Sequence, residues 1–369
     1  MRDLTIDISK CLGIFLVVLG HCLHNDSAAH DVIYLFHMPL FFFLSGFFFR
    51  EQDLLLFFRN KTKRLLYPFV FYYVFAKIWV IIHCIIVQRQ LPTFDLDFFL
   101  SVGPIWFLIS LWEIILLMNI VFRIKQDWVK SIIIIMFFTL GYYLSKENLS
   151  LPFFLTQSLI MLSFFYIGFI FRNKYFYKER SLYNLMTTGY FLRYIVVLVA
   201  FVWLLFLPHD RLDVYGMIFP SAMALIINAL VGIVGIICLS SLIASSCVKY
   251  PRRRFLFGIL QLGGVSSLHI MGLHYPLLIT MFYMTIPLII RTQEVLGIRV
   301  SEGYLLRYNT PLLTFTIALI LTIISSYMGD GWRIDFLDSL VNSLKSIFLE
   351  WNLLKTNLYI LKCLFTLLI

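Results

Sequence analysis

Long apolar runs follow one another along almost the whole chain, and this feature constrains the fold more than any other. A helix needs about 20 mostly apolar residues to cross the hydrocarbon core of a membrane. Only 14% of the residues are charged, whereas soluble domains carry about 25%. The sequence therefore predicts an all-α, polytopic membrane protein with about ten transmembrane helices. The predicted spans are 7–23, 32–49, 65–87, 104–122, 129–145, 153–171, 192–207, 219–246, 264–290 and 310–328.

Basic residues concentrate in every second loop between these runs, and the formal net charge is +10. Loops rich in Lys and Arg stay in the cytoplasm, so we expect both termini there and a location in the cell's inner (plasma) membrane. The basic residues form short clusters without a basic domain, so no nucleic-acid partner is predicted. The rich loops hold Arg50, Arg59, Lys61, Lys63, Arg64, Arg123, Lys125, Lys130, Arg172, Lys174, Lys178, Arg180, Arg193, Lys249, Arg252, Arg253 and Arg254.

The domain organisation is predicted to be simple, because no internal repeat or Gly/Ser-rich linker interrupts the apolar runs. Residues 1–336 are expected to form one membrane domain. Residues 337–369 mix apolar and charged residues and predict an amphipathic helix on the inner leaflet. An eleventh span over residues 351–369 is the alternative, although it would bury Lys355 and Lys362.

The first predicted span carries three ionisable residues: Asp7, Lys10 and His21. Charges inside a membrane are costly and usually functional. Lys10 and His21 are eleven positions apart, which returns to nearly the same helix face about 16 Å along the axis. Asp7 lies within one turn of Lys10 and can pair with it. The alternative is that Asp7 and Lys10 are interfacial residues and that His21 merely ends the helix.

The second span contains Phe-His-Met-Pro-Leu-Phe-Phe at residues 36–42 and Ser-Gly at residues 45–46. With Asp-Ile-Ser-Lys at residues 7–10 and with His21, this motif resembles the acyltransferase-3 family of integral membrane acyltransferases. The resemblance covers residues 2–328 in outline and is most specific in the first fifty residues and at 264–276. Further matches are Arg64 with Pro68, Trp106-Phe107-Leu108, and Ser-Leu-His-Ile-Met-Gly-Leu-His-Tyr-Pro at residues 267–276.

The resemblance implies transfer of an acyl group, usually acetyl from cytoplasmic acetyl-CoA, to a hydroxyl of an extracytoplasmic glycan or its lipid-linked precursor. The expected partners are therefore acyl-CoA as cosubstrate, a sugar acceptor and membrane lipid. The sequence departs from the family at Lys10, where many members carry Arg. Lysine keeps the positive charge but loses the bidentate fork of a guanidinium group.

A mechanism follows from the chemistry of these residue types. A sugar hydroxyl is a poor nucleophile and needs a base to take its proton, and histidine has an ordinary pKa near neutrality. We expect His21 to be the general base, with a transient acyl carrier as the alternative. Lys10 and Arg64 are expected to hold a phosphate of CoA, while Asp7 supports Lys10.

Four other residues are candidates for contact with the acceptor or for lining its passage. His37 and His274 have a structural hydrogen bond as their alternative role, and Trp106 has packing at the membrane interface. Glu113 is the fourth, with a charge pair or simple packing as alternatives. No metal is expected, because the spacing of His21, His24, His30 and His37 fits no ligand motif.

Three further interpretations remain open. Ser45-Gly46 is interpreted as a small-residue packing contact, with a nucleophile as the alternative. Arg211 and Asp213 are interpreted as a solvated loop pair, with contact to the acceptor as the alternative. Within the same chemistry, another acyl group or acceptor is possible. A rival of another class is a glycan-lipid flippase, although the paired broken helices typical of transporters are not evident.

Overall fold

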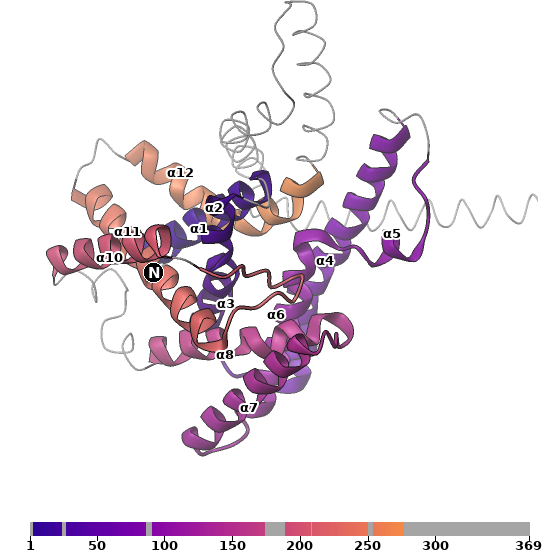
Figure 1. The fold of residues 1–369 in the computed structure, drawn as a ribbon, viewed down its shortest axis with the longest axis horizontal. Helices are drawn as coiled ribbons and strands as arrows, with labels where there is room; N and C mark the ends of the chain where they lie inside the picture. The colour runs from indigo at the N-terminus through magenta and orange to yellow at the C-terminus, as the bar shows by residue number, and fades with distance from the viewer. Residues whose placement is uncertain are drawn as a thin grey trace, which may run out of the picture. The chain divides into compact units, whose positions relative to one another are not determined.

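The computed structural model describes residues 3–23, 27–85, 91–173, 189–207, 209–249 and 254–276, and this part is helical throughout apart from its loops (Figure 1). An isolated antiparallel bridge joins Asp213 to Ile218 in one loop. The helices are α1 (Leu4–Cys22), α2 (Ala28–Tyr34), α3 (His37–Phe47), α4 (Leu54–His83), α5 (Leu96–Leu100), η2 (Gly103–Ile105), α6 (Trp106–Val121), α7 (Asp127–Lys146), η3 (Pro152–Phe154), α8 (Leu155–Phe171), α10 (Tyr190–Phe206), α11 (Ala222–Lys249) and α12 (Arg254–Val265).

The all-α membrane architecture is confirmed within these residues. In the part of the chain that the structure describes, seven helical segments are long and apolar enough to cross a membrane, and they overlap the first six and the eighth predicted spans. The seventh corresponds to α10, a shorter apolar helix. The ninth begins within the described residues, whereas the tenth, 310–328, lies outside them. The cytoplasmic placement of the termini stays a prediction.

The chain divides into two compact units, Met1–Thr322 and Ile323–Ile369. Every described residue belongs to the first unit. The predicted tail, 337–369, and the alternative eleventh span therefore lie outside the described residues.

The helix containing the third span begins earlier than the span predicted at residue 65. In α4, the Asp53 side chain accepts a hydrogen bond from the Leu54 amide and caps the helix. The first turns of α4 thus carry basic residues that were expected in a loop: Arg59, Lys61, Lys63 and Arg64. Hydropathy places the boundary after such a cluster, yet Lys and Arg are good helix formers. Likewise, α12 starts at Arg254, before the predicted boundary at residue 264.

The second predicted span, 32–49, is broken into α2 and α3 by a turn at Leu35 and Phe36. Pro39 lies in the first turn of α3, where a missing amide hydrogen is tolerated. His37 is the first residue of α3, and its Nδ1 atom donates a hydrogen bond to the Ile33 carbonyl at 3.0 Å. The break therefore makes His37 the first residue of α3, and the hydrogen bond to Ile33 fixes the orientation of its ring.

The central helices approach one another through glycine. A Cβ atom at Gly46 of α3 would lie 1.9 Å from the Phe165 carbonyl oxygen, and one at Gly168 of α8 would lie 2.1 Å from that of Phe43. Larger side chains at either position would push α3 and α8 apart. The predicted packing role of Gly46 is confirmed.

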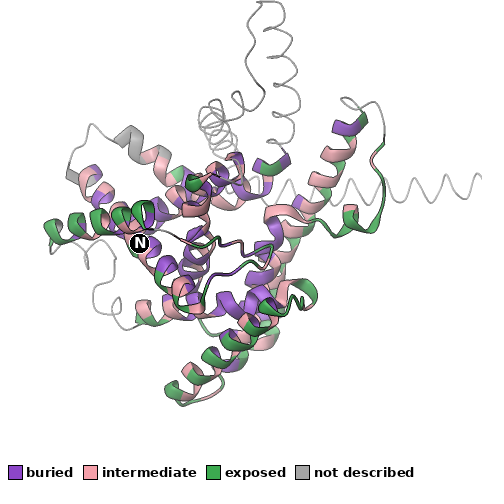
Figure 2. Ribbon diagram, in the orientation of Figure 1, coloured by how far each residue is buried: buried purple, intermediate pink, exposed green. Residues whose placement is uncertain are grey.

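Burial distinguishes the central helices from the peripheral ones. Much of α1, α3, α6 and α8 is buried, whereas α4, α7 and α10 expose apolar side chains on their outer faces (Figure 2). Exposed apolar faces on long helices are the expected surface for lipid. The central helices are therefore the ones that position the polar side chains considered next.

Candidate functional site

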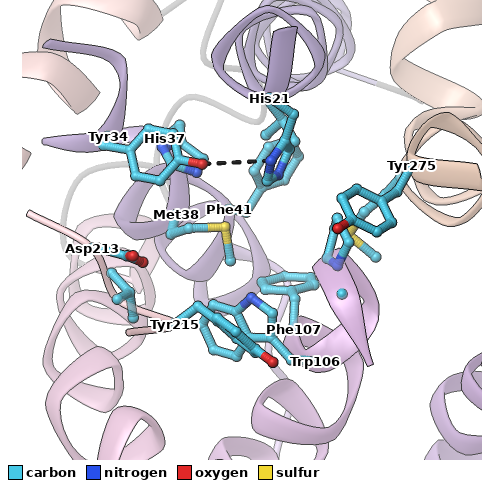
Figure 3. Close-up of a pocket in the computed structure, with 15 residues that line it drawn as sticks. His21, Tyr34, His37, Met38, Phe41, Trp106, Phe107, Asp213, Tyr215 and Tyr275 are labelled. Atoms are coloured by element: carbon cyan, nitrogen blue, oxygen red, sulfur yellow. Dashed lines mark hydrogen bonds between the residues drawn. The ribbon is translucent and has the colours of Figure 1, made fainter. Parts of the chain in front are cut away.

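A cavity of about 210 Å³ surrounds the end of α1, and we call it the histidine cavity (Figure 3). Side chains from five segments contribute to it: α1, the α2–α3 pair, η2 with α6, the loop before α11, and the helical stretch after α12. Its lining residues are Val17, His21, Tyr34, His37, Met38, Phe41, Gly103, Pro104, Trp106, Phe107, Asp213, Val214, Tyr215, Met271 and Tyr275.

His21 occupies the last turn of α1 and faces this cavity. The Tyr34 hydroxyl lies 3.5 Å from His21 Nδ1, at the limit of a hydrogen bond (Figure 3). The His274 ring lies beside it, with the two ring centroids 5.2 Å apart, and the Tyr275 ring centroid is 6.2 Å away. His21 is therefore placed among aromatic and imidazole rings, with one tyrosine hydroxyl to orient it.

His37 and His274 are held in the same way. In each ring Nδ1 donates a hydrogen bond to the backbone carbonyl four residues earlier, at 3.0 Å. In a neutral ring this leaves Nε2 as a hydrogen-bond acceptor. The buried Nε2 of His274 has no hydrogen-bond partner within the described residues. His37 lines the histidine cavity, whereas His274 lies next to His21 without lining it.

A second cavity, of about 370 Å³, lies farther along α1, and we call it the cation cavity. Its cationic lining residues are Lys10 from α1 and Lys61 and Arg64 from α4. Lys10 Nζ also lies 4.8 Å from the centroid of the Phe48 ring. The structure thus brings Lys10 and Arg64 together, as the predicted donor site requires. A site with several cations and a mostly apolar wall suits a phosphorylated ligand with an apolar arm.

The two cavities share three lining side chains: Phe41 of α3, Phe107 of α6, and Met271. We call this group the septum. Helix α1 passes both cavities, with Lys10 in one and His21 in the other. Lys10 and His21 are separated by about 16 Å along the helix axis, because eleven residues of an α-helix rise by that distance. A ligand with a long arm can therefore anchor in the cation cavity while its end reaches His21.

Three predicted residues do not line either cavity: His274, described above, Asp7 and Glu113. Asp7 is buried where α1 meets α12, and a Cβ atom at Gly264 of α12 would lie 2.0 Å from the Asp7 carbonyl oxygen. Glu113 of α6 accepts a hydrogen bond of 2.6 Å from the Ser158 hydroxyl of α8, and Ser158 also bonds to Ser110. This places Glu113 in a buried contact between two helices, which argues for a structural role.

Trp106 does line the histidine cavity, where its ring lies against other aromatic rings. Its centroid is 6.3 Å from that of Phe42, 5.8 Å from that of Phe154 and 6.2 Å from that of Tyr215. It is nearly buried, so packing limits the ring surface that a sugar can reach.

The loop before α11 contributes Asp213, which sequence reasoning gave as an alternative acceptor contact, and Tyr215, which it missed. Asp213 lines the histidine cavity and accepts a hydrogen bond from the Gly216 amide, whereas Arg211 is exposed. Tyr215 follows in the same loop. Burial, with help from Tyr275 and Asp213, raises the pKa of Tyr215, so its hydroxyl stays protonated and can donate a hydrogen bond. The loop carries no motif, and only its return to the cavity reveals these residues.

Other missed residues have local explanations. Tyr34 and Tyr275 adjoin the predicted His37 and His274 in sequence, so that proximity was the available signal. Lys61 was considered only as one of the loop cations that indicate the membrane topology. Within the described residues, no group of three His, Cys, Asp or Glu side chains is arranged to hold a metal ion.

Comparison with known proteins places this geometry in a context. The family model described as an acyltransferase domain, that of the acyltransferase-3 family, matches residues 3–329. No curated protein matches the chain. No solved structure matches it.

Proposed function

Because the chain belongs to the acyltransferase-3 family of membrane acyltransferases, we propose that it transfers an acetyl group from cytoplasmic acetyl-CoA to a glycan hydroxyl. The acceptor is a cell-surface glycan or its lipid-linked precursor, modified at the inner (plasma) membrane. The observation that carries the proposal is the meeting of the cation cavity and the histidine cavity at the septum. This arrangement separates donor anchoring from chemistry while keeping both on one path.

The donor binds with its phosphates in the cation cavity. Lys10, Lys61 and Arg64 supply positive charge from two helices, and charge-assisted hydrogen bonds to phosphate are stronger than neutral ones. The pantetheine arm then runs between the apolar side chains toward the septum. Its extended length is on the scale of the separation between Lys10 and His21.

The chemical step takes place in the histidine cavity. His21 accepts the proton of the acceptor hydroxyl as that oxygen attacks the thioester carbonyl carbon. A C–O bond forms, the C–S bond breaks, and the CoA sulfur leaves as a thiolate. The proton held by His21 then passes to that thiolate, which restores the neutral base. General base catalysis of this kind contributes a factor of about 10² to 10⁴.

Neighbouring side chains position the reacting groups. Tyr34 orients the His21 ring through Nδ1, which leaves His21 Nε2 to act on the hydroxyl. His37, Asp213 and Tyr215 provide acceptors and a donor for the sugar at the cavity wall. His274 stands beside His21 with an open acceptor atom and stabilises the protonated ring.

The test uses purified full-length protein in detergent with acetyl-CoA, with water in place of the acceptor hydroxyl, and free CoA is measured by chromatography. In parallel, mass spectrometry compares surface glycans from wild-type and deletion strains. CoA release together with loss of glycan acetyl groups on deletion supports the proposal. Absence of both, with a lipid-linked glycan retained on the inner leaflet, would instead favour a flippase without chemistry.

A further inference from the structure

The septum is the group of side chains that the two cavities share. Phe41, Phe107 and Met271 come from three different segments and line both spaces. If the acyl group travels from the cation cavity to His21, it must pass these side chains. We propose that the septum selects the acyl group by length, and that Met271 is the side chain that sets the limit. This inference rests on the proposed function.

Phe41 is held by its neighbours. A Cβ atom at Gly13 of α1 would lie 3.2 Å from two atoms of the Phe41 ring, so the ring lies directly against the α1 backbone. On its other side the ring meets Phe107 edge to face, with centroids 6.1 Å apart. Phe41 therefore has little room to swing out of the passage.

Phe107 is equally confined. Its ring centroid lies 4.8 Å from that of Phe42, a fully buried residue of the core. Both aromatic rings are thus part of close packing that continues into α3 and α6. Close-packed aromatic side chains do not give way to a passing group without disturbing their neighbours.

Met271 differs from the two rings in its chemistry. It is unbranched, with a flexible thioether chain that fills irregular gaps and changes shape easily. It lines both cavities and is only 9% exposed, so it is largely packed. Met271 is consequently the adjustable member of the septum, whereas the two rings are rigid. A short acyl group passes with a small rearrangement, whereas a longer one requires Met271 to leave its place.

The experiment compares acetyl-CoA with butyryl-CoA as donors for wild-type protein, Met271→Ala and Met271→Phe. The ratio of the two kcat/KM values is obtained from CoA release. One methylene at a selective apolar site changes such ratios by about tenfold or more. We expect Met271→Ala to raise the butyryl-to-acetyl ratio by at least about tenfold, and Met271→Phe to lower it below the wild-type value.

Met38→Ala is the matched control. Met38 lines the histidine cavity but not the cation cavity, so the variant enlarges the reaction space without opening the septum. We expect its donor ratio to stay near that of wild type. An increase in Met38→Ala with none in Met271→Ala would overturn the inference and place the length limit in the histidine cavity itself.

Two readouts separate the possible failures. If wild-type protein does not turn over acetyl-CoA, the proposed function is contradicted, and with it the role of the septum. Turnover in wild type with unchanged ratios in both Met271 variants contradicts the septum alone. Gel filtration verifies that each variant is folded. Met271→Leu conserves the side-chain volume and is expected to keep the wild-type ratio.

Discussion

The two cavities lie along the same helix, yet they differ in the polar groups that they present. The cation cavity carries Lys10, Lys61 and Arg64, whereas the histidine cavity carries imidazole and phenol groups and the carboxylate of Asp213. Cations attract an anionic ligand but are poor bases at neutral pH. An uncharged imidazole attracts an anion weakly but can act as a base near neutral pH. The difference supports the proposed division, in which the donor binds in the cation cavity and the chemistry takes place in the histidine cavity.

The largest expected effect comes from the histidine cavity. Replacing His21 with Ala removes the proposed base, and acetyl transfer is expected to fall by about 10² to 10⁴. The measurement is CoA release by purified protein, combined with the acetyl content of surface glycan in a complemented deletion strain. His83→Gln serves as the control, because His83 is buried in α4 and lines neither cavity. Full glycan acetylation by His21→Ala at normal expression contradicts the mechanism.

A smaller effect is expected from the cation cavity, and it should appear in binding. Lys61→Gln removes one of the proposed phosphate contacts, and charged hydrogen bonds contribute about 1.5–3 kcal/mol. The KM for acetyl-CoA is therefore expected to rise about tenfold or more, with kcat changed little. Lys63→Gln is the matched control on the same helix, because Lys63 is exposed and does not line the cavity. Equal changes in both variants would indicate a general charge effect.

A modest effect is expected at Tyr34. Its hydroxyl is 3.5 Å from His21 Nδ1, a long contact, so Tyr34→Phe should lower kcat by only about fivefold, equivalent to about 1 kcal/mol. The KM for acetyl-CoA should remain at the wild-type value, because the cation cavity is untouched. A changed KM with an unchanged kcat would place Tyr34 in donor binding instead.

The smallest effect on activity is expected at Glu113, which lines neither cavity. Glu113→Gln keeps an oxygen that accepts the Ser158 hydrogen bond, so turnover should stay within about twofold of wild type. Thermal unfolding in detergent measures any structural loss. A large fall in turnover without a fall in stability contradicts the structural role assigned to Glu113.

The sequence predicted those features that depend on local periodicity. The apolar runs located the helices, and the spacing of Lys10 and His21 placed them on one face of α1. The histidine motif at residues 36–42 also lies at the cavity, although the turn at Leu35 and Phe36 was not anticipated. That turn depends on contacts with other helices, which a hydropathy pattern does not record.

Features that depend on convergence of distant segments escaped prediction. Lys61 enters the cation cavity because α4 starts at Leu54 and brings its basic turns toward α1. Tyr215 reaches the histidine cavity from a loop that resembles any solvated connection, and for Asp213 of the same loop acceptor contact was only an alternative. The partner of Glu113 is Ser158, a neutral residue of α8, whereas a charge pair had been one expectation. In each case the partner lies on another helix, and the sequence gives no register between them.

The most direct test of the division between the cavities measures binding and turnover separately in two variants. A thioether analogue of acetyl-CoA, which cannot react, reports donor affinity by titration calorimetry with purified His21→Gln and Lys61→Gln. The account predicts that His21→Gln binds the analogue like wild type but loses turnover, while Lys61→Gln binds it about tenfold more weakly and keeps its kcat. Weakened binding in His21→Gln, with wild-type binding in Lys61→Gln, would contradict the account.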